Sequence, residues 1–307
     1  MLTVCDAADR YDRRMHRRQL ADYVALALIW GVSFVLVLQV VAAFGWIGAA
    51  AFRALIASAI LLVAARASGR VLRFGPWRPL AMVGATTVAG QLICLSFATP
   101  RIGTAMAAIF VGTIPLFSLL IGRLWGGERI SRSAMAGLLL GFGGIVLLVG
   151  FPAVPVTAVF VLGCCSSVLG SAFAAFGSNY AHRHLRVIGS WEQTIGSFFF
   201  GGAMSLPLLL VVPVPTIPGA PDIGFLVLLA GLCSSLAYVL YFRLVAEVGA
   251  TLAISVEFVV TVIAVFVGAV LLHEPLTPVQ LVGGAVIIAG CSQVLGLWPR
   301  RGRPASA

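Results

Sequence analysis

The chain contains one 48-residue pattern twice, at a constant spacing of 146 residues and without a gap. The first copy runs from Gly103 to Gly150 and the second from Gly249 to Gly296. Each copy is an apolar run, a short loop with one Glu, and a second apolar run. The matched positions include Gly122 with Gly268, Glu128 with Glu274, Gly137 with Gly283, and Gly144 with Gly290. Self-similarity at a fixed period marks a structural repeat, so the chain is predicted to consist of two related halves.

The composition predicts an integral membrane protein. Only 10% of the residues are charged and 61% are hydrophobic, whereas a soluble domain carries about 25% charged residues. Apolar runs near the length of a membrane-spanning helix occur ten times. They lack the alternation of an outer-membrane strand, so all are predicted to be helices. The ten segments are 21–42, 47–66, 79–99, 103–124, 133–151, 156–180, 190–212, 223–245, 250–273 and 278–297.

The arginines predict the orientation of these segments. Of the 20 basic residues, all of them Arg, 18 fall in the tails and loops of one side, which is therefore predicted to be cytoplasmic. This asymmetry accounts for the net charge of +10 without a nucleic-acid partner. Both termini are then inside, and the two copies, five segments apart, face opposite ways. The predicted units are a cytoplasmic tail (1–20), two inverted five-helix repeats (21–151 and 156–297) and a second tail (298–307).

An inverted repeat of membrane helices is typical of secondary transporters, whose site lies between the halves and is exposed to each side in turn. A membrane enzyme would need paired acids or a histidine cluster at one depth, and the sequence contains neither. The six Cys and four His have no metal-ligand spacing. The sequence therefore predicts a transporter with no enzymatic activity, no cofactor and no metal. The predicted partners are the lipid bilayer and a small-molecule substrate.

Several short motifs resemble a known family. They are Ile29-Trp30-Gly31-Val32-Ser33-Phe34, Phe52-Arg53, Pro115, Gly127-Glu128-Arg129-Ile130-Ser131 and Glu274-Pro275-Leu276-Thr277. With them, the chain resembles the EamA-type ten-helix carriers of the drug/metabolite transporter superfamily over about residues 20–298. The resemblance implies a bundle around a central cavity. It also implies export of amino acids or related metabolites, although some members carry sugars, nucleobases or drugs.

Two positions depart from the pattern of that family. Thr261 stands where a Pro equivalent to Pro115 is usual, which puts the expected kink of the ninth segment in doubt, and Glu257 stands at a usually apolar position. An acid at this depth costs about 2.5–3.5 kcal/mol to insert, so it should face the cavity or a partner. Glu257 is thus a candidate proton site or anchor for a substrate ammonium group. The alternative is a structural contact with Arg53 or Tyr238.

The remaining candidate residues form two groups. Arg53 could bind a substrate carboxylate or be a structural residue near the outer boundary. Pro115, Glu128 and Glu274 are candidates for a helix kink or for gating, and each Glu could instead cap the next helix. Residues that combine aromatic or small polar groups with a predicted position inside the membrane are candidates for lining the cavity: Trp30, Ser33, Phe34, Gln91, Tyr238, Tyr241 and Thr261.

The function predicted from the sequence is export of small metabolites such as amino acids, by alternating access through a central cavity in the inner membrane. The alternatives are efflux of drugs or cations, and uptake of another small organic solute such as a sugar or nucleobase. The sequence leaves open the substrate, the direction, the coupling ion, for which a proton is one candidate, and the choice between monomer and homodimer. Translation could also start at Met15 rather than Met1.

Overall fold

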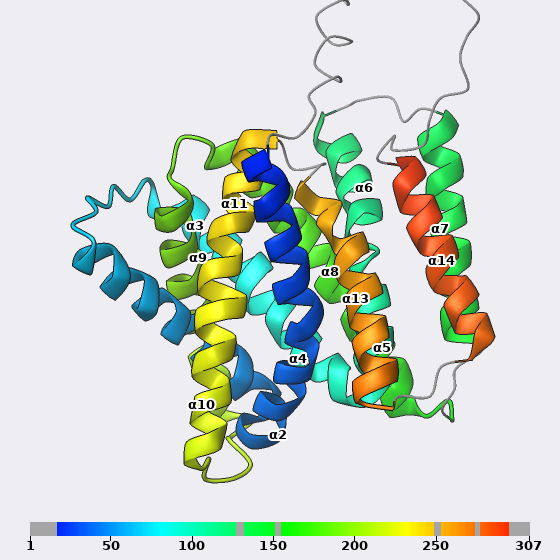
Figure 1. Cartoon of the computed structure of the whole chain (residues 1–307), viewed down its shortest axis with the longest axis horizontal. Helices are drawn as coiled ribbons and strands as arrows, with labels where there is room; N and C mark the ends of the chain where they lie inside the picture. The colour runs from blue at the N-terminus through cyan, green and yellow to red at the C-terminus, as the bar shows by residue number, and fades with distance from the viewer. Residues whose placement is uncertain (1–16, 127–131, 151–154, 249–252, 274–276, 295–307) are drawn as a thin grey trace, which may run out of the picture.

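The chain forms a bundle of helices (Figure 1). The computed structural model describes residues 17–126, 132–150, 155–248, 253–273 and 277–294, and none of these lies in a strand. Within the described residues, six helical stretches are long and apolar enough to cross a membrane: Arg17–Ala67, Trp77–Ile102, Thr104–Trp125, Ala158–His184, Ser190–Leu210 and Ala220–Val248. Shorter apolar helices are Met135–Gly144, Val256–Leu271 and Pro278–Gly290. The all-helical membrane class is confirmed, and the count of ten crossings stays a prediction.

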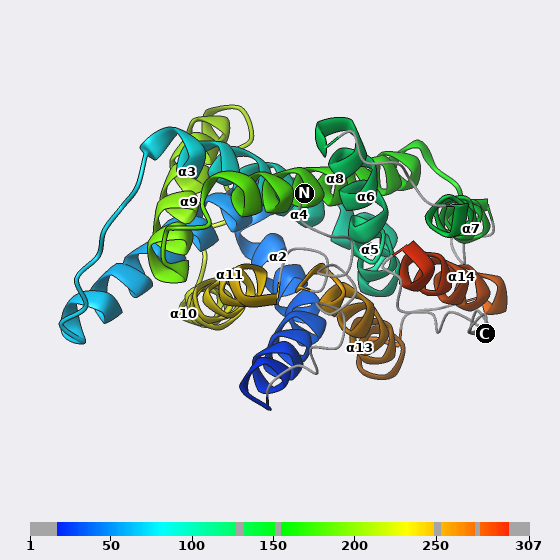
Figure 2. The ribbon, with the colours of Figure 1, turned by 90° about the horizontal axis from the view of Figure 1, so that it is seen from above.

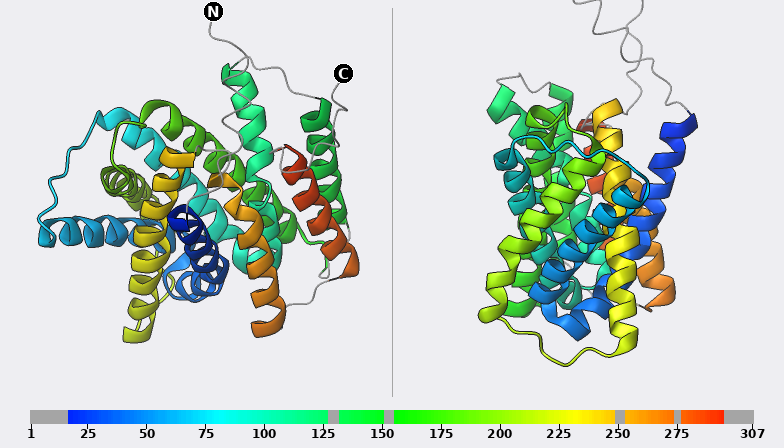
Figure 3. Two further views of the ribbon diagram at one scale, coloured as in Figure 1. Left: turned by 45° about the horizontal axis from the view of Figure 1, so that its top comes forward. Right: turned by 90° about the vertical axis from the view of Figure 1, so that its left-hand side faces the viewer.

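The first two predicted segments form a single bent helix. Helix α2 (Arg17–Ala67) continues through the expected loop and changes direction at Gly45, whose φ of 70° and ψ of 169° are not helical. Figure 3 shows the two arms of α2, in blue, running in different directions. A positive φ is readily adopted by glycine alone, so the bend depends on this residue. The two arms correspond to the predicted segments 21–42 and 47–66, without a loop between them.

The third and eighth predicted segments are each interrupted by a π-helix. The third consists of α3 (Trp77–Val83), η2 (Gly84–Gly90) and α4 (Gln91–Ile102). The eighth consists of α10 (Ala220–Leu228), η4 (Leu229–Leu236) and α11 (Ala237–Val248). Gly90, the last residue of η2, precedes Leu236, the last residue of η4, by 146 residues, which is the spacing of the repeat. The repeat therefore extends to the backbone geometry of segments outside the two matched copies. Such π-helical turns are rare and occur frequently at functional sites.

The fourth and ninth segments are also interrupted. The backbone turns at Gly112 and Thr113, between α5 (Thr104–Val111) and α6 (Ile114–Gly126). Pro115 is the second residue of α6, where its missing N–H group does not cost a helical hydrogen bond. In the ninth segment a turn at Ser255 precedes α13 (Val256–Leu271). This segment therefore has a local interruption despite Thr261, which lies inside regular helix. Glu128 and Glu274 lie outside the described residues.

The last helices of the two copies pair with each other, as Figures 1 and 2 both show. Helix α7 (Arg132–Gly150) packs along α14 (Pro278–Val294) through glycines. A Cβ atom on Gly144 would lie 2.7 Å from the carbonyl oxygen of Gly283, and one on Gly290 would lie 2.6 Å from that of Gly137. Gly144 matches Gly290 and Gly137 matches Gly283 in the repeat, so each contact is the symmetry equivalent of the other.

The rest of the bundle surrounds α2. Helix α2 packs against α4, α9 (Ser190–Ser205), η4 and α13. Helix α8 (Ala158–His184) packs against α4, α5 and α6. The 3-10 segment η3 (Leu206–Leu210) extends α9. Segments from both halves of the chain thus meet at α2, α4, α11 and α13, which is where the candidate site lies.

Candidate functional site

A cavity of about 40 Å³ lies where the two halves meet. It contains seven of the side chains predicted from the sequence to line a cavity or carry a charge in it: Trp30, Ser33, Phe34, Arg53, Gln91, Tyr238 and Glu257. Apolar residues complete the wall, namely Leu92, Leu95, Val111 and Val260. We call this space the main cavity. Its walls come from α2, α4, α5, α11 and α13, so residues far apart in the sequence are brought together only by the fold.

Arg53 is held in the wall of the main cavity by η4. Its side chain is buried, with 5% of the residue exposed. The Nε atom donates a hydrogen bond of 2.5 Å to Ser234 Oγ, and Nη2 donates one of 3.4 Å to the carbonyl oxygen of Cys233. The Trp30 indole donates to the same carbonyl oxygen at 3.0 Å. The π-helical turn therefore supplies the acceptors that fix one cation and one aromatic ring beside the cavity.

Glu257 lies in the same wall on α13 and is 6% exposed. Among the described residues, none forms an ion pair or a hydrogen bond with its carboxylate. In particular, the structural contacts considered from the sequence, with Arg53 or Tyr238, are not formed. A buried charge without a partner is costly in a membrane, so Glu257 remains a candidate for a functional role. The main cavity is thus bordered by one acid and one guanidinium group that do not neutralise each other.

The aromatic ring of Trp30 packs against two tyrosines of α11. The Trp30 ring lies 5.2 Å from that of Tyr238 and 5.4 Å from that of Tyr241, centroid to centroid. Tyr241 does not line the main cavity. It borders a second, smaller cavity of about 10 Å³, which shares Trp30, Gln91, Tyr238 and Glu257 with the first. These four side chains therefore separate the two spaces.

Thr261 lines neither cavity. Its hydroxyl lies within hydrogen-bond distance of two carbonyl oxygens, that of Ala108 at 3.0 Å and that of Glu257 at 2.7 Å. Thr261 therefore joins α13 to α5 one turn after Glu257. A Cβ atom on Gly112 would lie 2.9 Å from the Thr261 hydroxyl oxygen, so the glycine at the turn permits this close packing.

Two serines in and beside the site were not predicted from the sequence. Ser234 accepts the hydrogen bond of Arg53, and Ser178 accepts one of 2.9 Å from the Tyr241 hydroxyl. Serine is common throughout the apolar segments, so its presence alone singles out neither residue. Helical spacing could have identified Ser234, because it precedes Tyr238 by four residues and so shares its face. Nothing local connects Ser178 with Tyr241, which lie 63 residues apart.

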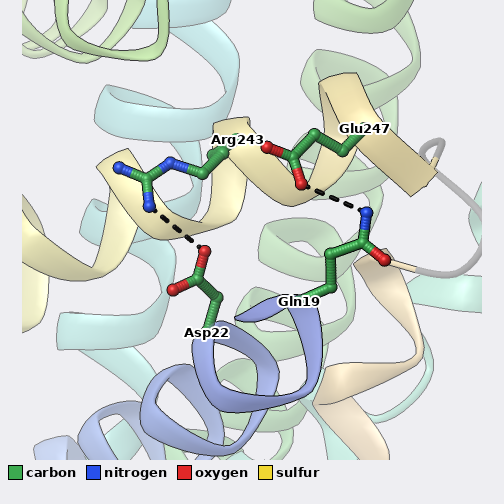
Figure 4. Close-up of polar contacts among 4 residues, drawn as sticks. All are labelled: Gln19, Asp22, Arg243 and Glu247. Atoms are coloured by element: carbon green, nitrogen blue, oxygen red, sulfur yellow. Dashed lines mark hydrogen bonds and ion pairs between the residues drawn. The ribbon is translucent and has the colours of Figure 1, made fainter. Parts of the chain in front are cut away.

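Polar contacts close one end of the bundle, where α2 begins (Figure 4). Asp22 forms an ion pair of 3.2 Å with Arg243, and Gln19 donates a hydrogen bond of 3.2 Å to Glu247. The Tyr23 hydroxyl lies 3.2 Å from that of Ser255, at the turn before α13. We call the contacts of Gln19 and Asp22 with α11 the latch. They hold α2 against α11 beyond the smaller cavity.

Breaking the latch is expected to open this end of the bundle slightly. In a cysteine-free background, a cysteine at Ile254, which lines the smaller cavity, should react faster with a maleimide when Asp22 is changed to Asn. A partly exposed ion pair contributes up to about 1 kcal/mol, so the expected gain is up to about five-fold. Reaction rates in detergent solution measure it. Arg243→Gln should have the same effect, and the double variant no more than either single change.

Arg186→Gln is the control for this experiment, because Arg186 contacts His182 instead. Equal reaction rates in the wild type and in Asp22→Asn would show that the latch does not restrict access to the smaller cavity.

Comparison with known proteins identifies relatives that match most of this chain. The chain is 27% identical over 295 residues to "Uncharacterized inner membrane transporter YedA" of Escherichia coli, covering 92% of each chain. It is 26% identical over 290 residues to "Protein PecM" of Dickeya dadantii, covering 92% of this chain and 95% of that protein. A "Probable terminal-alkyne amino-acid exporter" of Streptantibioticus cattleyicolor is 26% identical over 272 residues, covering 87% of this chain and 90% of that protein.

A solved crystal structure has the same fold, with a TM-score of 0.68 at 18% identity, covering 92% of this chain and 98% of its own. The model of the EamA-like transporter family matches residues 23–150 and again residues 161–296, which together span nearly the whole chain. The first match lies within residues 21–151 and the second within residues 156–297. The chain therefore belongs to the EamA-like transporter family.

Proposed function

We propose that this protein is a ten-span secondary transporter of the inner membrane that exports small zwitterionic metabolites such as amino acids. Arg53 binds the substrate carboxylate and Glu257 binds the ammonium group, while Trp30 and Tyr238 contact the side chain. The observation that carries the proposal is the arrangement of Arg53 and Glu257. They have opposite charges, border one cavity and are not paired with each other. A zwitterion supplies both missing counter-charges, whereas a sugar or a nucleobase supplies neither.

The size of the main cavity supports an alternating-access mechanism. A bound water needs about 10–15 Å³, so 40 Å³ holds only a few waters. Helices must move before an amino acid fits, and the interruptions next to the cavity are where movement is easiest. The π-helical segments η2 and η4 and the turns at Gly112 and Ser255 all adjoin it. With the predicted orientation, the latch closes the cytoplasmic end and must release before substrate enters from the cytoplasm.

The similarity to the S. cattleyicolor relative supports the amino-acid substrate class, because that protein is named as a probable terminal-alkyne amino-acid exporter. Efflux of organic cations is the second candidate. It is favoured by the unpaired acid Glu257 next to the rings of Trp30 and Tyr238, an arrangement that suits a cation. The two candidate functions differ in the role of Arg53, because its guanidinium group attracts a carboxylate and repels a cation.

The decisive experiment is an efflux assay. Bacterial cells with the protein or with empty vector are loaded with dipeptides, and the amino acids released are profiled by mass spectrometry. At least one amino acid is expected to leave faster with the protein. Arg53→Gln should slow this release about ten-fold or more, because a hydrogen bond to a charged group contributes about 1.5–3 kcal/mol.

Arg101→Gln provides the control for Arg53, because Arg101 stacks on Phe97 outside the cavity and should leave release unchanged. Release equal to that of the vector would contradict amino-acid export and direct the assay to cationic dyes. Normal release by Arg53→Gln would instead contradict the role of Arg53 as the carboxylate site.

A further inference from the structure

The smaller cavity contains an unexplained polar group. Thr87, in η2, is 2% exposed and lines this cavity, and its hydroxyl has no hydrogen-bond partner among the described residues. Buried hydroxyl groups are almost always hydrogen-bonded, and an exception commonly indicates a bound water or ion. The cavity measures about 10 Å³, which is close to the space that one water occupies. Thr87 and the cavity together therefore form a site for one bound water or ion.

The surroundings of this site are polar on several sides. The Thr87 hydroxyl lies against Gly177 of α8, where any Cβ atom would overlap it. The next residue, Ser178, donates to the carbonyl oxygen of Ala174 at 2.7 Å and accepts from Tyr241 at 2.9 Å. Glu257 borders the cavity as well. One water here could donate to or accept from Thr87 while it contacts the Glu257 carboxylate.

Glu257 is the one carboxyl group among the residues that line this site. The charged and titratable side chains around it are Arg53 and Tyr23 from α2, with Tyr238 and Tyr241 from α11. Arginine keeps its charge and tyrosine keeps its proton throughout the physiological range. The described part of α5 has no titratable side chain. Among the described residues around this cavity, Glu257 is therefore the group that takes up and releases a proton.

We propose that the smaller cavity is the proton path of the transporter on the latch side, where one water held by Thr87 exchanges protons with Glu257. This rests on the proposed function and specifies its coupling ion. The water accepts the proton of the Glu257 carboxyl group or returns one to it, so that one O–H bond forms as one breaks. It exchanges protons in turn with solvent at the latch end, where proton-driven export releases them to the cytoplasm. The main cavity lies on the other side of Glu257, so the proton and the substrate reach the same carboxylate by separate routes.

The test uses infrared spectroscopy of the purified full-length chain in lipid nanodiscs and needs no substrate. Glu257→Gln identifies the band of the protonated Glu257 carboxyl group, which should be present in the wild type at acidic pH and absent in the variant. Transfer into D₂O then measures how fast this proton exchanges. Thr87→Val is expected to keep the band but slow its exchange about ten-fold or more, because the water loses its hydroxyl anchor.

Thr86→Val is the matched control in the same π-helix. The Thr86 hydroxyl already donates to the carbonyl oxygen of Met82 at 2.8 Å and lines neither cavity, so exchange should keep its wild-type rate. Ser178→Ala is a second variant, on α8, which is expected to slow exchange and serves as the test if Thr87→Val does not fold.

Three results would overturn the proposal: exchange by Thr87→Val at the wild-type rate, equal slowing in Thr86→Val, or a carboxyl band that disappears on addition of Na⁺. The last result would assign the cavity to a sodium ion. These measurements do not depend on the efflux assay, so failure of the proton path and failure of amino-acid export can be told apart.

Discussion

Replacing Glu257 by Gln is expected to reduce proton-driven export about ten-fold or more while the protein remains in the membrane at wild-type amounts. Gln has the shape of Glu, but it can neither carry a proton in exchange nor balance a substrate ammonium group. Loss of a charge-assisted contact is worth about 1.5–3 kcal/mol, which corresponds to roughly ten-fold or more. Folding should persist, because Thr261 contacts the backbone carbonyl of residue 257 rather than its carboxylate.

The measurement is the rate of amino-acid release from dipeptide-loaded cells, with protein amounts determined by immunoblot. Asp222→Asn is a matched acid-to-amide control. Asp222 accepts a hydrogen bond of 2.8 Å from the Gly219 N–H at the start of α10, outside both cavities. An asparagine oxygen can accept the same bond. Release by Glu257→Gln at the wild-type rate would exclude Glu257 from both substrate binding and proton coupling.

The second large effect is expected at the crossing of α7 and α14. A Cβ atom on Gly144 would lie 2.7 Å from the carbonyl oxygen of Gly283 and 2.8 Å from the amide nitrogen of Ile287. Both neighbours are backbone atoms, which cannot rotate away, so Gly144→Ala must push the helices apart. Overpacking of this kind costs about 1–3 kcal/mol. The melting temperature of the purified protein, measured by fluorescence-detected size-exclusion chromatography, should fall clearly.

The adjacent residue provides the control. A Cβ atom on Gly143 would meet no atom within 4 Å, so Gly143→Ala should leave the melting temperature unchanged or raise it, because alanine favours helix. Gly290→Ala, the repeat equivalent of Gly144→Ala, should be as destabilising, since its Cβ would lie 2.6 Å from the backbone of Gly137 and of Gly141. Equal melting temperatures for Gly143→Ala and Gly144→Ala would show that the two helices are not packed in this way.

The different effects expected for Gly143→Ala and Gly144→Ala illustrate what a repeat in the sequence can predict. The match of Gly144 with Gly290 and of Gly137 with Gly283 marks these positions by sequence alone. Small residues at helical spacing then indicate close packing. The sequence does not say which helix is the partner, however. Only the fold shows that the two copies pack against each other, with Gly144 on Gly283 and Gly290 on Gly137.

The sequence by itself determined the all-helical membrane class, the family and most of the polar groups of the site. The class and the polar groups follow from physics that acts locally: too few charges for a soluble surface, and polar groups that are too costly to face lipid. The family follows instead from the resemblance of short motifs. Arg53 and Glu257 were identified in this way. They lie 204 residues apart, and no local pattern relates them.

Only the tertiary structure decided how these groups are arranged. It placed Arg53 on the acceptors of η4, left Glu257 without a partner among the described residues, and turned Thr261 away from both cavities. It also revealed the bend at Gly45, the two π-helical segments and the smaller cavity with Thr87. The physical reason is that the arrangement of the site depends on contacts between helices far apart in the chain, whereas a sequence pattern reports only the spacing within one helix.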